Sequence, residues 1–234
     1  MLFRMFKIIL SVFLIIIFTI NAYAVDISPA QWKMLKKGEV VKWLEPVKGT
    51  EVKKGVAIGI VNASPEDIWA VLHQNNDFKA FMPRTIKSIL VHPSAIPGAV
   101  ALKFDHNTPD PKALIKYLRQ HRAEKMTGTT GYFFSLLNMP WPLVNRWYII
   151  KLEDFVTSSR WFQHWIMVMG NVKTNNGSWE LVPLDKRRTL VTYTLFTDPG
   201  GSVPDFLINL GTNVTLPGVI EAVRKRVKEE FSKK

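Results

Sequence analysis

The sequence has no cysteine among its 234 residues. Disulfide bonds, thiolate nucleophiles, cysteine-ligated zinc and iron–sulfur clusters are therefore excluded. The absence does not identify the redox compartment, because a chain of this length can bury a sizeable core without disulfides. With 47% hydrophobic and 21% charged residues, the composition is that of a folded globular protein.

Common signatures of hydrolases and metal sites are also missing. The chain contains no G-x-S-x-G motif, which positions the nucleophile of many hydrolases. None of the five histidines stands in an H-E-x-x-H or H-x-H arrangement, and a catalytic zinc needs three convergent ligands. We therefore expect no metal ion and no cofactor. Zinc-finger, helix-turn-helix and single-strand-binding patterns are absent too, so nucleic acid is not an expected partner.

Only one long apolar run occurs, Ile8–Ile20, and it is shorter than the ~20 residues that a membrane span needs. Two cations, Arg4 and Lys7, precede the run, and Ala22-Tyr23-Ala24 follows it. This order is typical of a secretory signal, so residues 1–24 are predicted to be a signal peptide cleaved after Ala24. The alternative is an uncleaved N-terminal anchor. Either way the protein is expected to be exported: to the periplasm in a Gram-negative host, otherwise secreted or anchored.

Acidic residues are few relative to basic ones: 19 Asp and Glu stand against 31 Lys and Arg, a net charge of +12. Most cations are scattered, and a solvated helix face is the usual meaning of such a pattern. The C-terminal residues 224–234 carry the largest cluster. An anionic membrane surface is the partner that this cluster would suit.

Capping residues and apolar periodicity predict the elements of the chain. Helices are expected at Pro29–Lys37, from Pro65 after a capping Ser64, at Phe78–Met82, at Lys112–Lys125, and after Ser202, with Pro217 expected to kink or split this last helix. Strands are expected at Glu39–Leu44, Val52–Val61, Thr85–Val91, Gly131–Leu137, Trp147–Leu152, Arg160–Met169, Ser178–Leu184 and Thr189–Thr197. Residues 173–177 are predicted to be a turn. We therefore expect one α+β domain over residues 25–234.

Three stretches in this order resemble a known superfamily, the START-related lipid-transfer and polyketide-cyclase-like group. Val61–Leu72, continuing to Phe81-Met82-Pro83, is similar to its strand-to-helix opening. Pro140–Tyr148 resembles its Pro-x-Pro…Arg-Asp corner, although Trp147 stands where the family usually has aspartate. Gly177–Pro183, Thr189–Tyr193 and Asp198–Pro204 look like the last two strands and the start of the terminal helix.

The resemblance implies the helix-grip fold, a curved antiparallel sheet wrapped around a long C-terminal helix. It also implies an elongated apolar cavity between them that takes a lipid or another hydrophobic molecule. The superfamily holds carriers, sensors and a few enzymes, so the fold alone does not give the function.

Strand alternation places one of Gln163 and His164 inside, where a polar group could orient a ligand or be satisfied by a neighbour. Arg146 could bind a carboxylate or phosphate, or form a structural ion pair. Both faces of Trp161–Met169 are apolar, as in a strand covered on one side and lining a cavity on the other. The candidate ligand-binding residues are Arg146, Tyr148, Ile150, Gln163, His164, Trp165, Met167, Phe196, Leu207, Leu210 and Val214.

The leading hypothesis is a carrier or sensor that desolvates a lipid between sheet and terminal helix. The alternative is a cyclase or dehydratase on the same fold, acting on an aromatic or polyketide-like substrate. That enzyme needs an inward acid or base, and His164 and Glu180 are its candidate catalytic residues. A third hypothesis is an interaction module whose cavity is filled by its own side chains.

Overall fold

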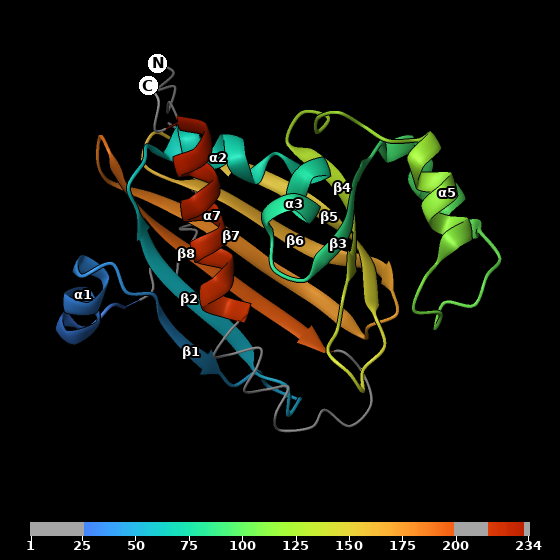
Figure 1. Cartoon of the computed structure of the whole chain (residues 1–234), viewed down its shortest axis with the longest axis horizontal. Coiled ribbons are helices and arrows are strands. Elements are labelled where there is room, and N and C mark those ends of the chain that lie inside the picture. Colours follow the sequence, from blue (N-terminus) through green and yellow to red (C-terminus); the bar gives the residue numbers. More distant parts are fainter. Residues whose placement is uncertain (1–25, 199–214, 232–234) are drawn as a thin grey trace, which may run out of the picture.

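A computed structural model describes residues 26–198 and 215–231 of the chain (Figure 1). The predicted signal peptide lies outside the described residues. So do the candidate ligand-binding residues Leu207, Leu210 and Val214. Within the described ranges, no helix is both long and apolar enough to cross a bilayer.

Eight antiparallel strands form one sheet in the order β1-β2-β8-β7-β6-β5-β4-β3. From β4 to β8 each strand pairs with the next along the chain, so this part of the sheet is a meander. Its strands are β1 (Val41–Glu45), β2 (Lys54–Val61), β3 (Thr85–Val91), β4 (Thr130–Leu137), β5 (Arg146–Val156), β6 (Trp161–Gly170), β7 (Thr174–Asp185) and β8 (Arg188–Asp198).

The helices begin where the sequence offers caps. Ser28 and Ser64 each accept a hydrogen bond from the backbone N–H three residues on, and a proline follows each serine as the first helical residue. The α-helices are α1 (Pro29–Lys36), α2 (Pro65–Leu72), α3 (Phe78–Phe81), α4 (Ile96–Ala101), α5 (Lys112–Gln120) and α7 (Leu216–Phe231), with short 3-10 helices at Asn75–Asp77 and Pro93–Ala95. Pro217 lies in the first turn of α7, where a proline is tolerated.

Helices cover both faces of the sheet (Figure 1). On the inner face, α7 and α2 bury their apolar sides against a core that includes Ala57, Ile150 and Leu181. On the outer face, α4 and α5 cover β3, β4 and β5, and α1 covers β1 and β2. The fold is thus α+β, with the C-terminal helix packed against an eight-stranded antiparallel sheet, as expected.

The helix α7 approaches β2 closely because β2 presents glycines to it. A Cβ on Gly59 would lie 2.6 Å from Ile220 Cγ2, and a Cβ on Gly55 would lie 2.7 Å from Leu216 Cδ1. Arg224 then ties the helix to the sheet side, since its guanidinium donates to the carbonyls of Ile60 (3.0 Å) and Gly38 (2.9 Å). These contacts set the height of the helix above the inner face.

Three predicted boundaries were wrong by more than two residues. The strand predicted at Trp147–Leu152 extends to Val156. The helix predicted at residues 112–125 ends at Gln120, because residues 121–123 bond to the edge of β3: His92 N–H donates to His121 O, and Ala123 N–H to Leu90 O. The turn predicted at 173–177 is mostly strand, since β7 begins at Thr174. The first polar residues of β7 contact β6, since Trp165 Nε1 of β6 donates a hydrogen bond to Asn175 Oδ1 (2.9 Å).

Candidate functional site: an apolar cavity beneath the C-terminal helix

A cavity of about 590 Å³ lies between the inner face of the sheet and α7. Its volume falls within the ~300–1,000 Å³ typical of small-molecule sites. Each of the strands from β4 to β8 supplies at least two lining residues, and β1, β2 and β3 supply one each. The apolar and aromatic lining includes Phe78, Phe133, Ile150, Leu152, Trp165, Trp179, Leu195, Leu216 and Val219. Such a wall can desolvate an apolar ligand along its length.

Five of the candidate ligand-binding residues line this cavity: Arg146, Tyr148, Ile150, Gln163 and Trp165. Tyr148 and Ile150 alternate along β5, and Gln163 and Trp165 along β6, so each pair reaches the same face of the sheet. Three other candidates, His164, Met167 and Phe196, are not among the described lining residues.

The two candidate catalytic residues lie on the outer face of the sheet. His164 Nε2 is 2.9 Å from Glu153 Oε2, and its ring stacks on Phe155 at an interplanar angle of 11°. Glu180 forms an ion pair with Arg160. Neither residue lines the cavity. The strand alternation that turns Gln163 inward turns His164 outward, which settles the choice between the two that the sequence left open.

Tyr148 and Tyr193 both line the cavity. Burial raises the pKa of Tyr148, and hydrogen bonds with Ser135 and Asn175 oppose this rise. Burial also raises the pKa of Tyr193, and the neighbouring Tyr148 adds to the shift. Both hydroxyls therefore stay neutral at physiological pH and can donate hydrogen bonds to a ligand.

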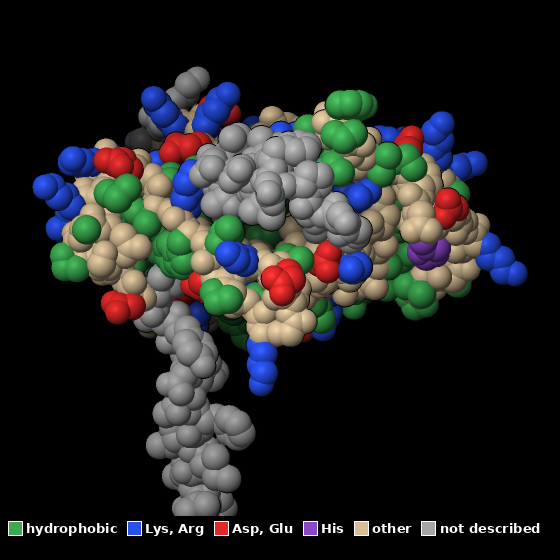
Figure 2. Space-filling view, turned by 90° about the horizontal axis from the view of Figure 1, so that it is seen from below, with side chains coloured by type: hydrophobic (Ala, Val, Ile, Leu, Met, Phe, Trp, Pro, Cys, Tyr) green, Lys and Arg blue, Asp and Glu red, His purple; other side chains and the backbone are tan. Residues whose placement is uncertain are grey.

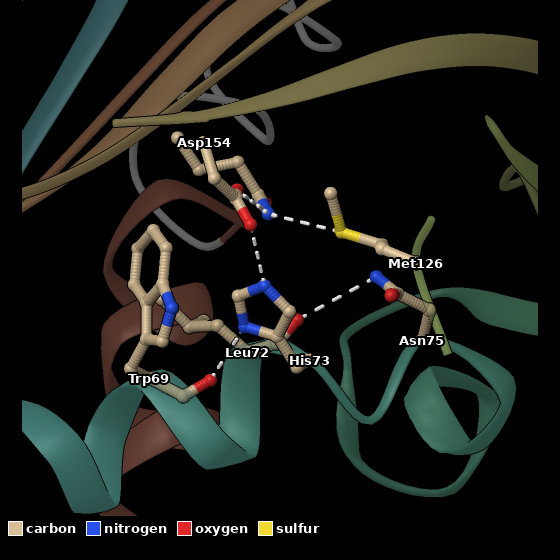
Figure 3. A network of polar contacts seen from close by, with 7 residues as sticks. Trp69, Leu72, His73, Asn75, Met126 and Asp154 are labelled. Carbon is tan, nitrogen blue, oxygen red and sulfur yellow. Dashed lines mark hydrogen bonds and ion pairs between the residues drawn. The ribbon is translucent and has the colours of Figure 1, made fainter. Parts of the chain in front are cut away.

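A polar network begins at the cavity lining and reaches α2 (Figure 3). Gln163 lines the cavity, and its amide donates to Asp154 Oδ1 (2.8 Å). Asp154 Oδ2 lies 2.8 Å from Nε2 of His73, at the C-terminus of α2, and Nδ1 of the same ring lies 2.8 Å from the Trp69 carbonyl oxygen. The carbonyl and the carboxylate only accept hydrogen bonds, so both ring nitrogens must donate to satisfy them. This geometry selects the charged imidazolium.

The pKa of His73 is raised in agreement with that geometry. Burial alone would lower it from its ordinary value of 6.5, but the Asp154 carboxylate and the Trp69 carbonyl outweigh burial. A histidine whose folded pKa is raised stabilises the fold fully below its unfolded pKa, and the stabilisation is lost as the pH rises through the folded value.

The His73–Asp154 coupling energy is therefore expected to be larger near pH 5.5 than near pH 9. A double-mutant cycle of His73→Gln, Asp154→Asn and the double variant measures it from denaturant unfolding at the two pH values. The cycle cancels the separate loss of the Gln163 contact in each Asp154 variant. A coupling energy that is equal at both pH values would contradict the charged pair.

The basic surface that the sequence suggested is partly neutralised. On α7, Arg224 pairs with Glu221, Lys225 with Glu229, and Arg226 with Glu230. The face in Figure 2 shows basic and acidic side chains interspersed, not one basic patch. In residues 26–198 and 215–231, no group of three metal-ligating side chains lies together.

Sequence reasoning missed several polar residues in and beside the cavity. Among them are Asn75 and Arg84, which line it, and His73 and Asp154, which join Gln163 in the polar network. His73 and Asp154 are 81 positions apart, and no local pattern pairs them. Asn75 is 2% exposed, and its Oδ1 accepts no hydrogen bond from the described residues. The only available signal was for Arg84, which follows the Phe81-Met82-Pro83 segment of the resemblance.

Comparison with known proteins gives the fold. No protein-family model matches the sequence. An uncharacterized protein of Pseudomonas aeruginosa is 28% identical over 116 residues, which cover 44% of this chain and 57% of that protein. The match thus spans little more than half of the relative's length.

Solved structures match over most of the chain. A STAR-related lipid transfer protein fragment from Xanthomonas axonopodis has a TM-score of 0.58 and 22% identity, covering 81% of this chain and 93% of its own. Human STARD10 has a TM-score of 0.59 and 15% identity, covering 83% of this chain and 71% of its own. The Zhui aromatase/cyclase from Streptomyces sp. R1128 has a TM-score of 0.51 and 12% identity, covering 78% of this chain and 98% of its own. These likenesses show the START-like fold, which lipid-transfer proteins and a cyclase share.

Proposed function

We propose that this START-like chain binds a lipid or another hydrophobic molecule in its cavity and carries or senses it. The observation that supports the proposal most is the aromatic and aliphatic lining of a 590 Å³ space between sheet and α7. A core built only for stability is packed to the density of an organic crystal, with few voids larger than a water molecule. Packing for stability therefore does not explain a cavity of this size, whereas a ligand-binding function does.

Binding without turnover suits the described residues better than the cyclase alternative. The acid–base candidates lie on the face away from the cavity, where His164 contacts Glu153 and Glu180 pairs with Arg160. Within the described lining, Glu51 is the one carboxylate and there is no histidine. The lining is thus rich in groups that desolvate and orient a ligand. Export and docking on an anionic membrane stay predictions of the sequence.

Native mass spectrometry of the protein, purified without detergent, tests the proposal directly. We expect a stoichiometric co-purifying molecule, which lipid analysis of the organic extract would identify. Affinity within a series of one-chain ligands is expected to rise about fourfold per added methylene, from ~0.8 kcal/mol per buried CH₂. A ligand-free mass that persists after incubation with host lipid extract would contradict the proposal.

Filling the cavity is expected to weaken binding. Leu195→Trp adds a large ring to the lining of β8 and removes space that the ligand needs. We expect at least a tenfold loss of affinity for a neutral fluorescent probe such as Nile red, because displaced apolar contact costs more than ~1.4 kcal/mol.

Ile166→Trp is the matched control for this substitution. Ile166 lies on β6, is 48% exposed and does not line the cavity. The same increase in side-chain size there is expected to leave probe affinity within about twofold of the wild type. Equal losses in the two variants would place the probe outside the cavity.

A further inference from the structure

Most of the charged residues that line the cavity are basic. Lys53, Arg84 and Arg146 are basic, and Glu51 is the acidic one among the described lining residues. No ion pair within residues 26–198 and 215–231 engages either arginine. Elsewhere in the described chain arginines commonly pair with carboxylates, as Arg160, Arg188 and Arg226 do.

The two arginines lie at one end of the sheet, on β5 and just before β3, the two strands that flank β4. Arg146 begins β5 and pairs with Leu137 of β4. Arg84 lies just before β3, and its carbonyl accepts the N–H of Asn138, the residue after Leu137 (2.8 Å). Two strand spacings, roughly 10 Å, thus separate their backbones. Both long side chains line the same cavity, so their guanidinium groups can reach one head group.

Arg146 carries a buried donor without an acceptor. Its Nε makes no hydrogen bond within the described structure, and its Nη1 reaches only the Val144 carbonyl at 3.5 Å. An unsatisfied buried donor is costly, and more so on a charged group. The next residue, Trp147, turns to the outer face and offers no carboxylate. A ligand oxygen would supply the missing acceptor.

Arg84 occupies a backbone conformation that favours glycine. Its φ is +60°, in the left-handed region, which is sterically unfavourable for a residue that carries a Cβ. Glycine would adopt this conformation without strain, so the backbone of the turn does not explain why an arginine stands here. Strained residues of this kind gather at ligand clamps. The backbone thus gives no reason for an arginine here, and the positive charge that Arg84 brings to the cavity needs another explanation.

We propose that the cavity takes an amphiphile with an anionic head group, a carboxylate or a phosphate, held by Arg84 and Arg146. This rests on the proposed function and names the ligand class for the same site. The tail runs along β5 past Tyr148, Ile150 and Leu152, which alternate inward from Arg146. Six residues of strand at ~3.3 Å each give about 20 Å from Arg146 to Leu152, the length of a long single chain.

Displacement of Nile red by three ligands with one tail tests the proposal. Tetradecanoate is expected to displace the probe at a concentration at least about tenfold below that of tetradecanol, with tetradecylamine weakest. Tetradecyl phosphate is expected to match or exceed tetradecanoate, and the order of these two separates the head groups. Inorganic phosphate alone is expected to leave the probe in place, because it lacks the tail.

In an Arg84→Gln/Arg146→Gln variant, the acid is expected to lose its advantage and bind within about twofold of the alcohol. The control Arg119→Gln/Arg187→Gln makes the same charge change at exposed positions outside the cavity and is expected to keep the tenfold preference. The comparison of tetradecanoate with tetradecanol uses only the wild-type protein, so it does not depend on whether a variant folds.

Equal binding of acid and alcohol by the wild type would overturn the anionic head group. So would a double variant that keeps the preference, or inorganic phosphate that competes as well as tetradecanoate. Failure of every amphiphile to displace the probe would instead overturn the proposed function itself.

Discussion

Replacing Trp147 by alanine is expected to lower the free energy of unfolding by about 3–5 kcal/mol, the range for deleting a large buried aromatic side chain. Trp147 is 0% exposed and lies in the outer-face core with Phe134, Leu136 and Ile149. Its indole Nε1 donates to the Thr108 carbonyl (2.9 Å), a bond that spans 39 positions of the chain. Denaturant unfolding monitored by circular dichroism measures the loss.

Trp141→Ala is the matched control, since Trp141 is 89% exposed in the β4–β5 connection. We expect a change within about 0.5 kcal/mol for it. A loss near 3 kcal/mol in both variants would mean that the outer core does not depend on the buried indole. Because Trp147 faces away from the cavity, Trp147→Ala protein that remains folded is expected to keep the wild-type affinity for Nile red.

Replacing Gly177 by alanine is expected to cost about 1–3 kcal/mol of stability, as overpacking of a well-packed core does. A Cβ at this position would meet the Thr194 carbonyl oxygen and the Trp165 indole. The carbonyl belongs to the ladder between β7 and β8 and cannot move aside without breaking it. Trp165 lines the cavity, so its displacement is also expected to weaken binding of the probe.

Gly218→Ala is the control for this change. Gly218 lies within α7, and the nearest atom to an added Cβ is Pro83 Cγ at 3.5 Å, an ordinary contact. Because alanine favours a helix over glycine by up to about 1 kcal/mol, this variant is expected to be as stable as the wild type or more so. Both variants are compared by denaturant unfolding and by Nile red titration. A Gly177→Ala protein as stable as Gly218→Ala would contradict the packing described for β7.

The strands and most helices followed from short-range patterns. The strand predicted at Thr85–Val91 has those bounds in the structure, and helix α2 begins after Ser64 as expected. These signals act within a few residues, as a serine that caps the next turn or an apolar residue every second position. The turn predicted at 173–177 was wrong because its signal, Asn-Asn-Gly, is overridden by contacts with Trp165 on another strand.

The sequence by itself determined the strand alternation and the caps, and it placed Tyr148 and Gln163 on predicted strands. Only the tertiary structure decided which face of the sheet α7 covers, and hence that Gln163 lines the cavity while His164 does not. It also brought His73 to Asp154 and placed Arg84 near Arg146. Periodicity fixes which residues share a face, but only packing across the chain fixes what each face meets.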